Sequence, residues 1–126
     1  MTIEEKLISY LSGITSAGAS VYAERPVSIS GKYLLIERTG SSRLDCIETF
    51  TVAVQSIVPK AFGSMADAMA LNEEVKEALL GEDGTEKWGM ISDSSVSSVG
   101  LNSDYNYTDT QTEEYRYQAI FLVTKY

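Results

Sequence analysis

Hydrophobic and polar residues alternate along residues 44–58 of the chain. This period of two is typical of a β-strand with one apolar face. Two polar residues, Glu48 and Ser56, interrupt the apolar face. The polar face in turn contains the apolar residues Ile47, Ala53 and Ile57, so we expect it to be partly covered. At roughly 3.3 Å per residue the strand would be about 50 Å long, more than one small core needs. The pattern therefore favours a role in assembly. One face would hold Cys46, Phe50, Val52, Val54 and Val58, and the other Asp45, Thr49, Thr51 and Gln55.

Two segments have the spacing of amphipathic helices. In the first, Thr2 and Glu5 have capping-box spacing and Gly13 marks the end. In the second, Ser64 and Asp67 repeat the capping box, and the helix extends to Gly81. The apolar positions of the first helix are Ile3, Leu7, Tyr10, Leu11 and Ile14, and the stripe of the second is Met65, Ala68, Met69, Asn72, Val75, Ala78 and Leu79.

The remaining patterns predict strands and loops. Residues 21–24 form a short strand, and residues 33–39 form a longer one that pairs antiparallel with 44–58 across a four-residue loop, 40–43. Residues 88–101 form a further strand, with a bulge or an edge position, because Val96 and Val99 do not alternate cleanly. We interpret the polar stretch 102–112 as a loop or hairpin tip, and 113–126 as the last strand.

Composition and charge limit the classes of protein to which this chain can belong. The chain has 126 residues, a single-domain length, and a net charge of −8. Residues 67–114 hold twelve acids and two bases, so that section carries −10. Tight phosphate binding needs clustered Lys and Arg, so we expect no specific binding to nucleic acid. The first residues are acidic where a signal peptide is basic, which predicts a soluble protein that is not secreted.

The chemistry of common active sites is absent from the sequence. The chain has no His, which removes the commonest general base, and one Cys, which excludes a thiolate zinc site. No phosphate-binding loop, dinucleotide fingerprint or calcium-loop spacing is present. Paired carboxylates occur only on faces or element ends that we expect to be exposed. The sequence therefore predicts no catalytic residue, no metal site, no cofactor and no enzyme.

Tyrosine is frequent, with eight residues. Tyr is enriched at interfaces because it has a rigid apolar ring with a polar tip. For Tyr115 and Tyr117 we expect packing within the sheet. Tyr105 and Tyr107 stand in a polar loop, where contact with a partner protein and exposure to solvent are equally expected. The candidate contact residues are Gly40, Ser41, Ser42, Arg43, Tyr105 and Tyr107.

Four segments together resemble one family. They are the opening IEEKLISYL helix, the YLLIERT–GSSR hairpin, the SMADAMALNEEVKEALL helix and the final YRYQAIFLVTKY strand. In their order and lengths they resemble the tail terminator and tail-completion proteins of long-tailed bacteriophages and prophages, the lambda-type tail-tube capping family. The resemblance covers nearly the whole chain, residues 1–126, as one domain.

The resemblance implies an α+β fold, with a mostly antiparallel sheet of about four to five strands and two helices packed on one face. It also implies a ring, usually a hexamer, that caps the tail tube, stops its growth and offers a joining surface to the head connector. Its partners would be other copies, the tube protein and the connector, with no membrane, and DNA would pass through without specific binding.

The protein would then lie in the virion tail, at the head–tail junction, and in the host cytoplasm during assembly. The acidic section 67–114 is the candidate for residues lining the channel. Two alternatives stay open: a head-completion or minor capsid or tail component of the same machine, and a bacterial ligand-binding module.

Overall fold

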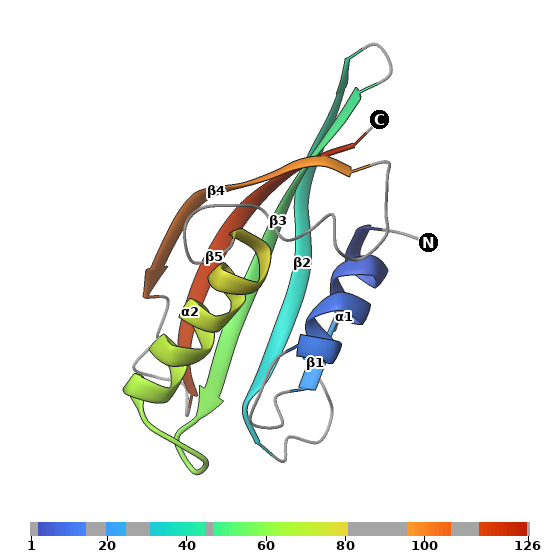
Figure 1. Cartoon of the computed structure of the whole chain (residues 1–126). Coiled ribbons are helices and arrows are strands. Elements are labelled where there is room, and N and C mark those ends of the chain that lie inside the picture. Colours follow the sequence, from blue (N-terminus) through green and yellow to red (C-terminus); the bar gives the residue numbers. More distant parts are fainter. Residues whose placement is uncertain are drawn as a thin grey trace.

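The computed structural model describes residues 3–14, 20–24, 31–44, 47–80, 96–106 and 114–125. These residues form two helices and five strands, which Figure 1 labels along the chain. The elements are α1 (Ile3–Ile14), β1 (Ser20–Tyr22), β2 (Tyr33–Leu44), β3 (Ile47–Pro59), α2 (Met65–Leu80), β4 (Val96–Asn106) and β5 (Glu114–Lys125).

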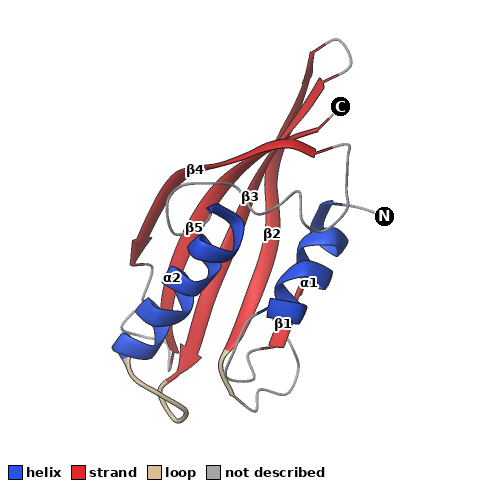
Figure 2. Ribbon diagram, viewed as in Figure 1, coloured by secondary structure: helices blue, strands red, loops and turns tan. Residues whose placement is uncertain are grey.

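The strands form one sheet in the order β1-β2-β3-β5-β4. β1 pairs parallel with β2, and the other three pairs are antiparallel. Both helices lie on the same side of this sheet (Figure 2). The predicted α+β class, the mostly antiparallel sheet and its two helices are therefore confirmed.

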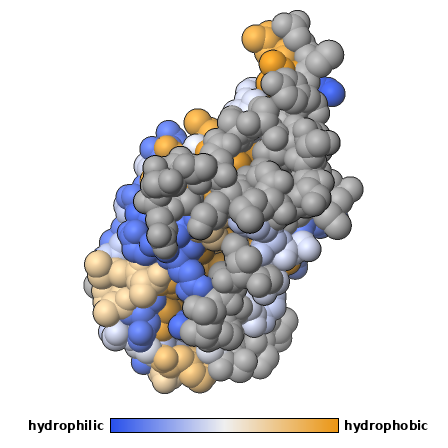
Figure 3. All heavy atoms as spheres, viewed as in Figure 1, coloured by the Kyte–Doolittle hydropathy of each residue, from blue (hydrophilic) through white to orange (hydrophobic). Residues whose placement is uncertain are grey.

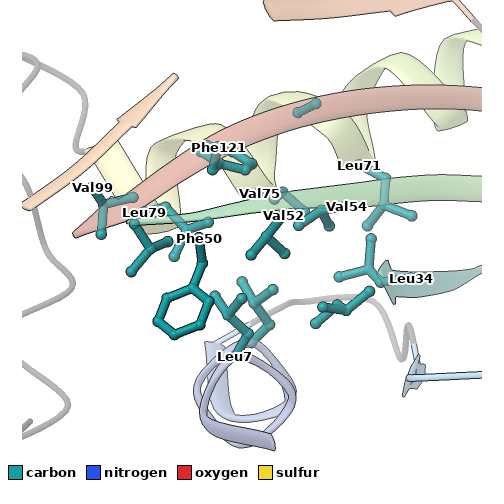
Figure 4. Close-up of a cluster of buried hydrophobic side chains, with 14 residues drawn as sticks. Leu7, Leu34, Phe50, Val52, Val54, Leu71, Val75, Leu79, Val99 and Phe121 are labelled. Atoms are coloured by element: carbon teal, nitrogen blue, oxygen red, sulfur yellow. The ribbon is translucent and has the colours of Figure 1, made fainter. Parts of the chain in front are cut away.

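The core lies between the helices and one face of the sheet. The apolar face expected for the long strand is present in β3, where Phe50, Val52 and Val54 are buried. Leu7 of α1 and Leu71 of α2 reach the same cluster, as Figure 4 shows. The fully enclosed part of the core also contains Leu11, Leu34, Ile36, Val75, Leu79, Ala119, Phe121 and Val123.

The second helix begins as predicted. The Ser64 backbone N–H donates a hydrogen bond of 2.8 Å to Asp67 Oδ2, which is half of a capping box, and the Ser64 hydroxyl donates to the same oxygen at 3.3 Å. Its buried stripe is rotated from the predicted one. Met69 is 48% exposed and Leu71 is buried, because the helix presents positions 68, 71, 72, 75 and 79 to the sheet.

The predicted loop at residues 40–43 is wrong. Gly40, Ser41, Ser42 and Arg43 belong to β2, and Leu44 pairs with Ile47 of β3, whereas residues 45 and 46 lie outside the described residues. Small polar residues are typical of turns, but here they continue a strand whose side chains face solvent. A register shift between Arg38 and Gly40 leaves Thr39 as a bulge.

The boundaries of β4 also differ from the prediction. The strand covers Val96–Asn106, so the expected loop at 102–112 is wrong for its first five residues, whereas 88–95 and 107–112 lie outside the described part. Its described side chains from position 100 onward are exposed. This edge strand is therefore rich in the small and polar residues that loops also contain. The predicted edge position and bulge are both found, with register shifts between Val96 and Ser98 and between Leu101 and Ser103.

Candidate protein-interaction surfaces

The β2–β3 hairpin projects beyond the two helices (Figure 1). We call its outer part, residues 40–44 of β2 and 47–51 of β3, the distal hairpin. Phe50 is its one buried side chain, and Arg38 covers that ring with its guanidinium carbon 5.4 Å from the ring centroid. At the far end Leu44 is 77% exposed and Ile47 is 42% exposed. Hydrophobic atoms gather at this tip in Figure 3.

Four of the six candidate contact residues lie in the distal hairpin. They are exposed and stand opposite β3 in unbroken register, Gly40 with Thr51, Ser41 with Phe50, Ser42 with Thr49 and Arg43 with Glu48. Paired strands hold them, so they form a fixed ribbon. The sequence did not single out Leu44 or Ile47, because it placed both inside the long strand rather than beside the reversal of the chain.

Tyr105 lies on edge strand β4 and is 43% exposed. Its hydroxyl oxygen accepts a hydrogen bond of 2.6 Å from Gln118 Nε2 of β5. The ring is thus anchored at its polar tip while almost half of the side chain remains exposed. Tyr107, the other tyrosine proposed as a contact, lies outside the described residues.

The sheet face away from the helices is short of charge in its central rows, apart from the exposed Glu37, which pairs with Ala53. Residues paired across strands share a face, which places Thr51 beside Leu122 and Gln55 beside Gln118. Leu122 is 39% exposed and Ile120 is half-buried. Exposed carboxylates are more numerous on α2, at Asp67, Glu73 and Glu77. The two sides of the subunit therefore differ in character, one with few charges and partly apolar, the other acidic.

An ion pair joins α2 to β4. Lys76 Nζ lies 2.8 Å from Asp104 Oδ2 and 2.7 Å from Glu73 Oε1, and Asn72 Nδ2 donates to the same Asp104 oxygen at 3.2 Å. The hydrogen bond from Lys76 lowers the pKa of Asp104, and the bonds to Asp104 and then Glu73 raise the pKa of Lys76. This cluster fixes the edge strand against the helix that covers the core.

The acidic section is not one continuous surface. Glu114, at the start of β5, is only 4% exposed, and it accepts a hydrogen bond of 2.7 Å from the Tyr33 hydroxyl of β2. The Tyr33 ring packs edge-on against Tyr22, with centroids 6.0 Å apart. Glu114 therefore holds strands of its own subunit together. The sequence gives no signal for this pair, because its members are 81 positions apart.

The described residues contain neither a metal-binding cluster nor a helix suited to span a membrane. No group of three or more Cys, Asp or Glu side chains in this part of the chain is placed to hold a metal ion. None of the described helices has the length and apolar character needed to cross a bilayer. Three surface features of the described residues stand out, namely the distal hairpin, the edge strand β4 and the sheet face away from the helices.

Comparison with known proteins gives a structural match only. No family model matches the sequence, and no curated protein matches it. Among solved structures, the fold is similar to a chain from the virion of a native gene transfer agent particle, with a TM-score of 0.72. The match covers 98% of this chain and 93% of the other, at 15% sequence identity. The two chains therefore share an overall fold along nearly their whole length.

Proposed function

We propose that this protein is a structural component of a phage-like particle, and specifically a tail terminator or close relative that forms a ring at the end of the tail tube. The fold it shares with a gene transfer agent virion chain, over nearly the full length of both, is the observation that supports this most. The resemblance of its helices, hairpin and last strand to tail-completion proteins is an independent support from the sequence.

The surfaces described above suit such a role. A hairpin with an exposed apolar tip gains by burying Leu44 and Ile47 against a partner, at about 25 cal/mol for each Å² removed from water. In the proposed ring Gly40, Ser41, Ser42 and Arg43 contact neighbouring subunits, with Tyr105 and Tyr107 as further contacts. The protein acts by surface complementarity, and it binds the tube protein on one side and the head connector on the other.

The charge on α2 suits a channel that DNA crosses. Asp67, Glu73 and Glu77 are exposed, and carboxylates facing a duplex repel its phosphates, so DNA would slide past without specific binding. We propose these α2 carboxylates as the described residues nearest to the channel. Glu114 is not among them, because it is buried against Tyr33.

Gene deletion in the source strain tests the function. Without the protein we expect tubes of irregular length that are not joined to heads, measured by electron microscopy of the released particles. Complementation with the native gene should restore uniform joined tails. Particles of normal length and joining after deletion would contradict the proposal, and full heads that leak DNA beside tails of normal length would favour head completion.

A further inference from the structure

The distal hairpin overhangs the helices of its own subunit (Figure 1). Residues paired across strands share a face. Ser41 is opposite the core residue Phe50, and Arg43 is opposite Glu48, two positions away, so Ser41 and Arg43 lie on the side of the sheet that carries the helices. Both residues are exposed. The overhang therefore leaves a helix-side surface that is open to another molecule.

The exposed charge on this surface is positive. Among the described residues of the distal hairpin, Arg43 is the one charged residue that is exposed, whereas Glu48 is half-buried. Arg38, at the base of the overhang and on the same side, is also exposed while it covers the Phe50 ring. No ion pair of Arg43 occurs within the described part of the chain. Its guanidinium can therefore receive a carboxylate from a partner.

The outer side of α2 has the opposite charge. The helix turns its buried residues toward the sheet, and Ala66, Ala70, Glu73 and Glu77 form an exposed stripe that faces away from it. Glu73 Oε1 lies 2.7 Å from Lys76 Nζ, but the Glu73 side chain is still 63% exposed. For Glu77 the described residues provide no ion pair. The stripe therefore ends in two carboxylates that a cation can approach.

The two surfaces agree in spacing. Two residues along a strand span about 6.6 Å, and four residues along a helix span about 6 Å. The distance from Ser41 to Arg43 is thus close to the distance from Glu73 to Glu77. When the two surfaces are aligned, the Ser41 hydroxyl can donate to Glu73 while the Arg43 guanidinium donates to Glu77.

We propose that the distal hairpin of one copy of this chain lies across the outer side of α2 of the next copy, with Arg43 paired to Glu77 and Ser41 to Glu73. A second copy is the occupant that the charges favour. Each copy carries a net charge of −8, so two copies repel each other unless a basic surface of one meets an acidic surface of the other. The inference rests on the ring of the proposed function and names the surfaces that build it.

This contact can repeat from copy to copy. It uses a different surface on each copy, and such contacts close into rings. The two surfaces do not meet within one subunit, because the hairpin projects beyond α2 (Figure 1). Met69, which is 48% exposed on α2, can cover the aliphatic part of the Arg43 side chain. Asp67, nearer the start of α2, stays open toward the proposed channel.

Charge reversal tests the pairing. Arg43→Glu and Glu77→Lys each place like charges opposite each other, so we expect either variant to need an about tenfold higher protein concentration than the wild type to form rings. The double variant Arg43→Glu/Glu77→Lys restores opposite charges and should assemble like the wild type. An equimolar mixture of the two single variants should also assemble, because alternating copies place opposite charges at every contact. Light scattering over a concentration series measures all four.

Net charge does not explain a loss that both single variants share, because Arg43→Glu makes the chain more negative and Glu77→Lys makes it less negative. Glu24→Lys, at an exposed residue outside both surfaces, is the matched control for Glu77→Lys and should assemble like the wild type. Single variants that assemble at wild-type concentrations, a double variant no better than the single ones, or a wild type that stays monomeric would each overturn the contact.

A disulfide separates a head-to-tail contact from a two-fold one. The Arg43→Cys/Glu77→Cys variant, in a Cys46→Ala background with oxidised glutathione, should form a ladder at multiples of 13.8 kDa on non-reducing gels. Cross-linking that stops at the dimer would overturn the head-to-tail arrangement in favour of a two-fold contact.

The outcomes also separate this inference from the proposed function. A wild-type ring combined with unaffected single variants would overturn the contact between the hairpin and α2 and leave the ring standing. Assembly that is lost in the single variants and restored in the double variant would support the contact. If deletion of the gene nevertheless had no effect on tails, the contact would stand and the terminator role would be contradicted.

Discussion

The inner and outer parts of the β2–β3 hairpin are built from the same two strands but differ in how far their side chains are buried. In the inner part, residues 33–38 and 52–59, Leu34, Val54 and Val58 are fully buried beneath the helices. In the distal hairpin only Phe50 is buried. The ladder is continuous across both apart from one bulge at Thr39. Strand length in this protein is therefore not set by the core it covers.

This difference in burial indicates a function for the distal hairpin. A ribbon of two strands in water is at best marginally stable by itself, and the rows from Ser42 to Leu44 bury little of their own. The inner part supplies the stability that holds these rows in register. We infer that the distal hairpin is retained for contacts with other subunits, and matched substitutions in the two parts test this difference.

The largest expected effect comes from the same substitution made in both parts. Leu34→Ala removes a side chain with 0% exposure from the core and should lower the free energy of unfolding by about 2–5 kcal/mol. Leu44→Ala, at 77% exposure, should change it by less than about 0.5 kcal/mol. Urea unfolding of both variants measures the difference. Equal losses of stability would mean that the distal hairpin belongs to the core.

Two glycines provide the next pair. A Cβ atom at Gly63 would lie 2.6 Å from Asp67 Oδ2 and 2.7 Å from Val58 Cγ1, at the inner end of β3, whereas one at Gly40 meets nothing within 4 Å. Gly63→Ala should cost about 1–3 kcal/mol, because the buried Val58 and the capping carboxylate must both move. Gly40→Ala should be close to neutral in thermal unfolding. A neutral Gly63→Ala would show that this end of the hairpin is loosely packed.

Two serines provide a third pair, in which the buried substitution should raise the free energy of unfolding rather than lower it. The Ser56 hydroxyl is fully buried, with no hydrogen-bond partner among the described residues. Ser56→Ala should raise the free energy of unfolding by about 1 kcal/mol, since an unsatisfied buried hydroxyl carries its full desolvation cost. Ser42→Ala, in the exposed outer rows, should leave stability unchanged. A loss of stability in Ser56→Ala, seen in urea unfolding, would mean that the hydroxyl is bonded after all.

The smallest effect concerns the tie between α2 and edge strand β4. Because the pKa of Asp104 is lowered in the folded protein, its pairing with Lys76 stabilises the fold above the ordinary value of 3.8, and this contribution is lost as pH falls through the lower folded value. Asp104→Asn should cost about 0.5 kcal/mol near neutral pH. The difference from wild type should shrink at low pH, and a constant difference would contradict the ion pair.

Sequence patterns predicted most of the fold, because burial and periodicity coincide in its core. β5 and α1 alternate between apolar and polar positions at the right period, and their boundaries follow. The pattern failed at Gly40, Ser41 and Ser42 and again at residues 102–106, where strands are exposed on both faces. A strand without a buried face has no reason to alternate, so its small polar residues are indistinguishable from those of a turn.

Candidate surfaces were only partly accessible to sequence reasoning. Tyr105 could be singled out because an aromatic ring in a polar stretch is unusual. The irregular spacing of Val96 and Val99 indicated a bulge or an edge position for β4, but the full strand order could not be predicted, since it depends on contacts between distant segments. The Tyr33–Glu114 hydrogen bond was hidden for the same reason, because no local pattern relates its two members.

Native mass compared between the wild type and a shortened hairpin tests the central claim most directly. The shortened variant lacks Ser42 and Arg43 together with their opposite residues Thr49 and Glu48, so two rows are removed while every remaining side chain keeps its face. Light scattering over a concentration series, with negative-stain images, should show closed rings for the wild type and, for the variant, a folded monomer slightly lighter than the 13.8 kDa of the full chain. Rings formed equally well by both proteins, or a wild type that is monomeric at every concentration, would contradict the claim that the distal hairpin exists for assembly.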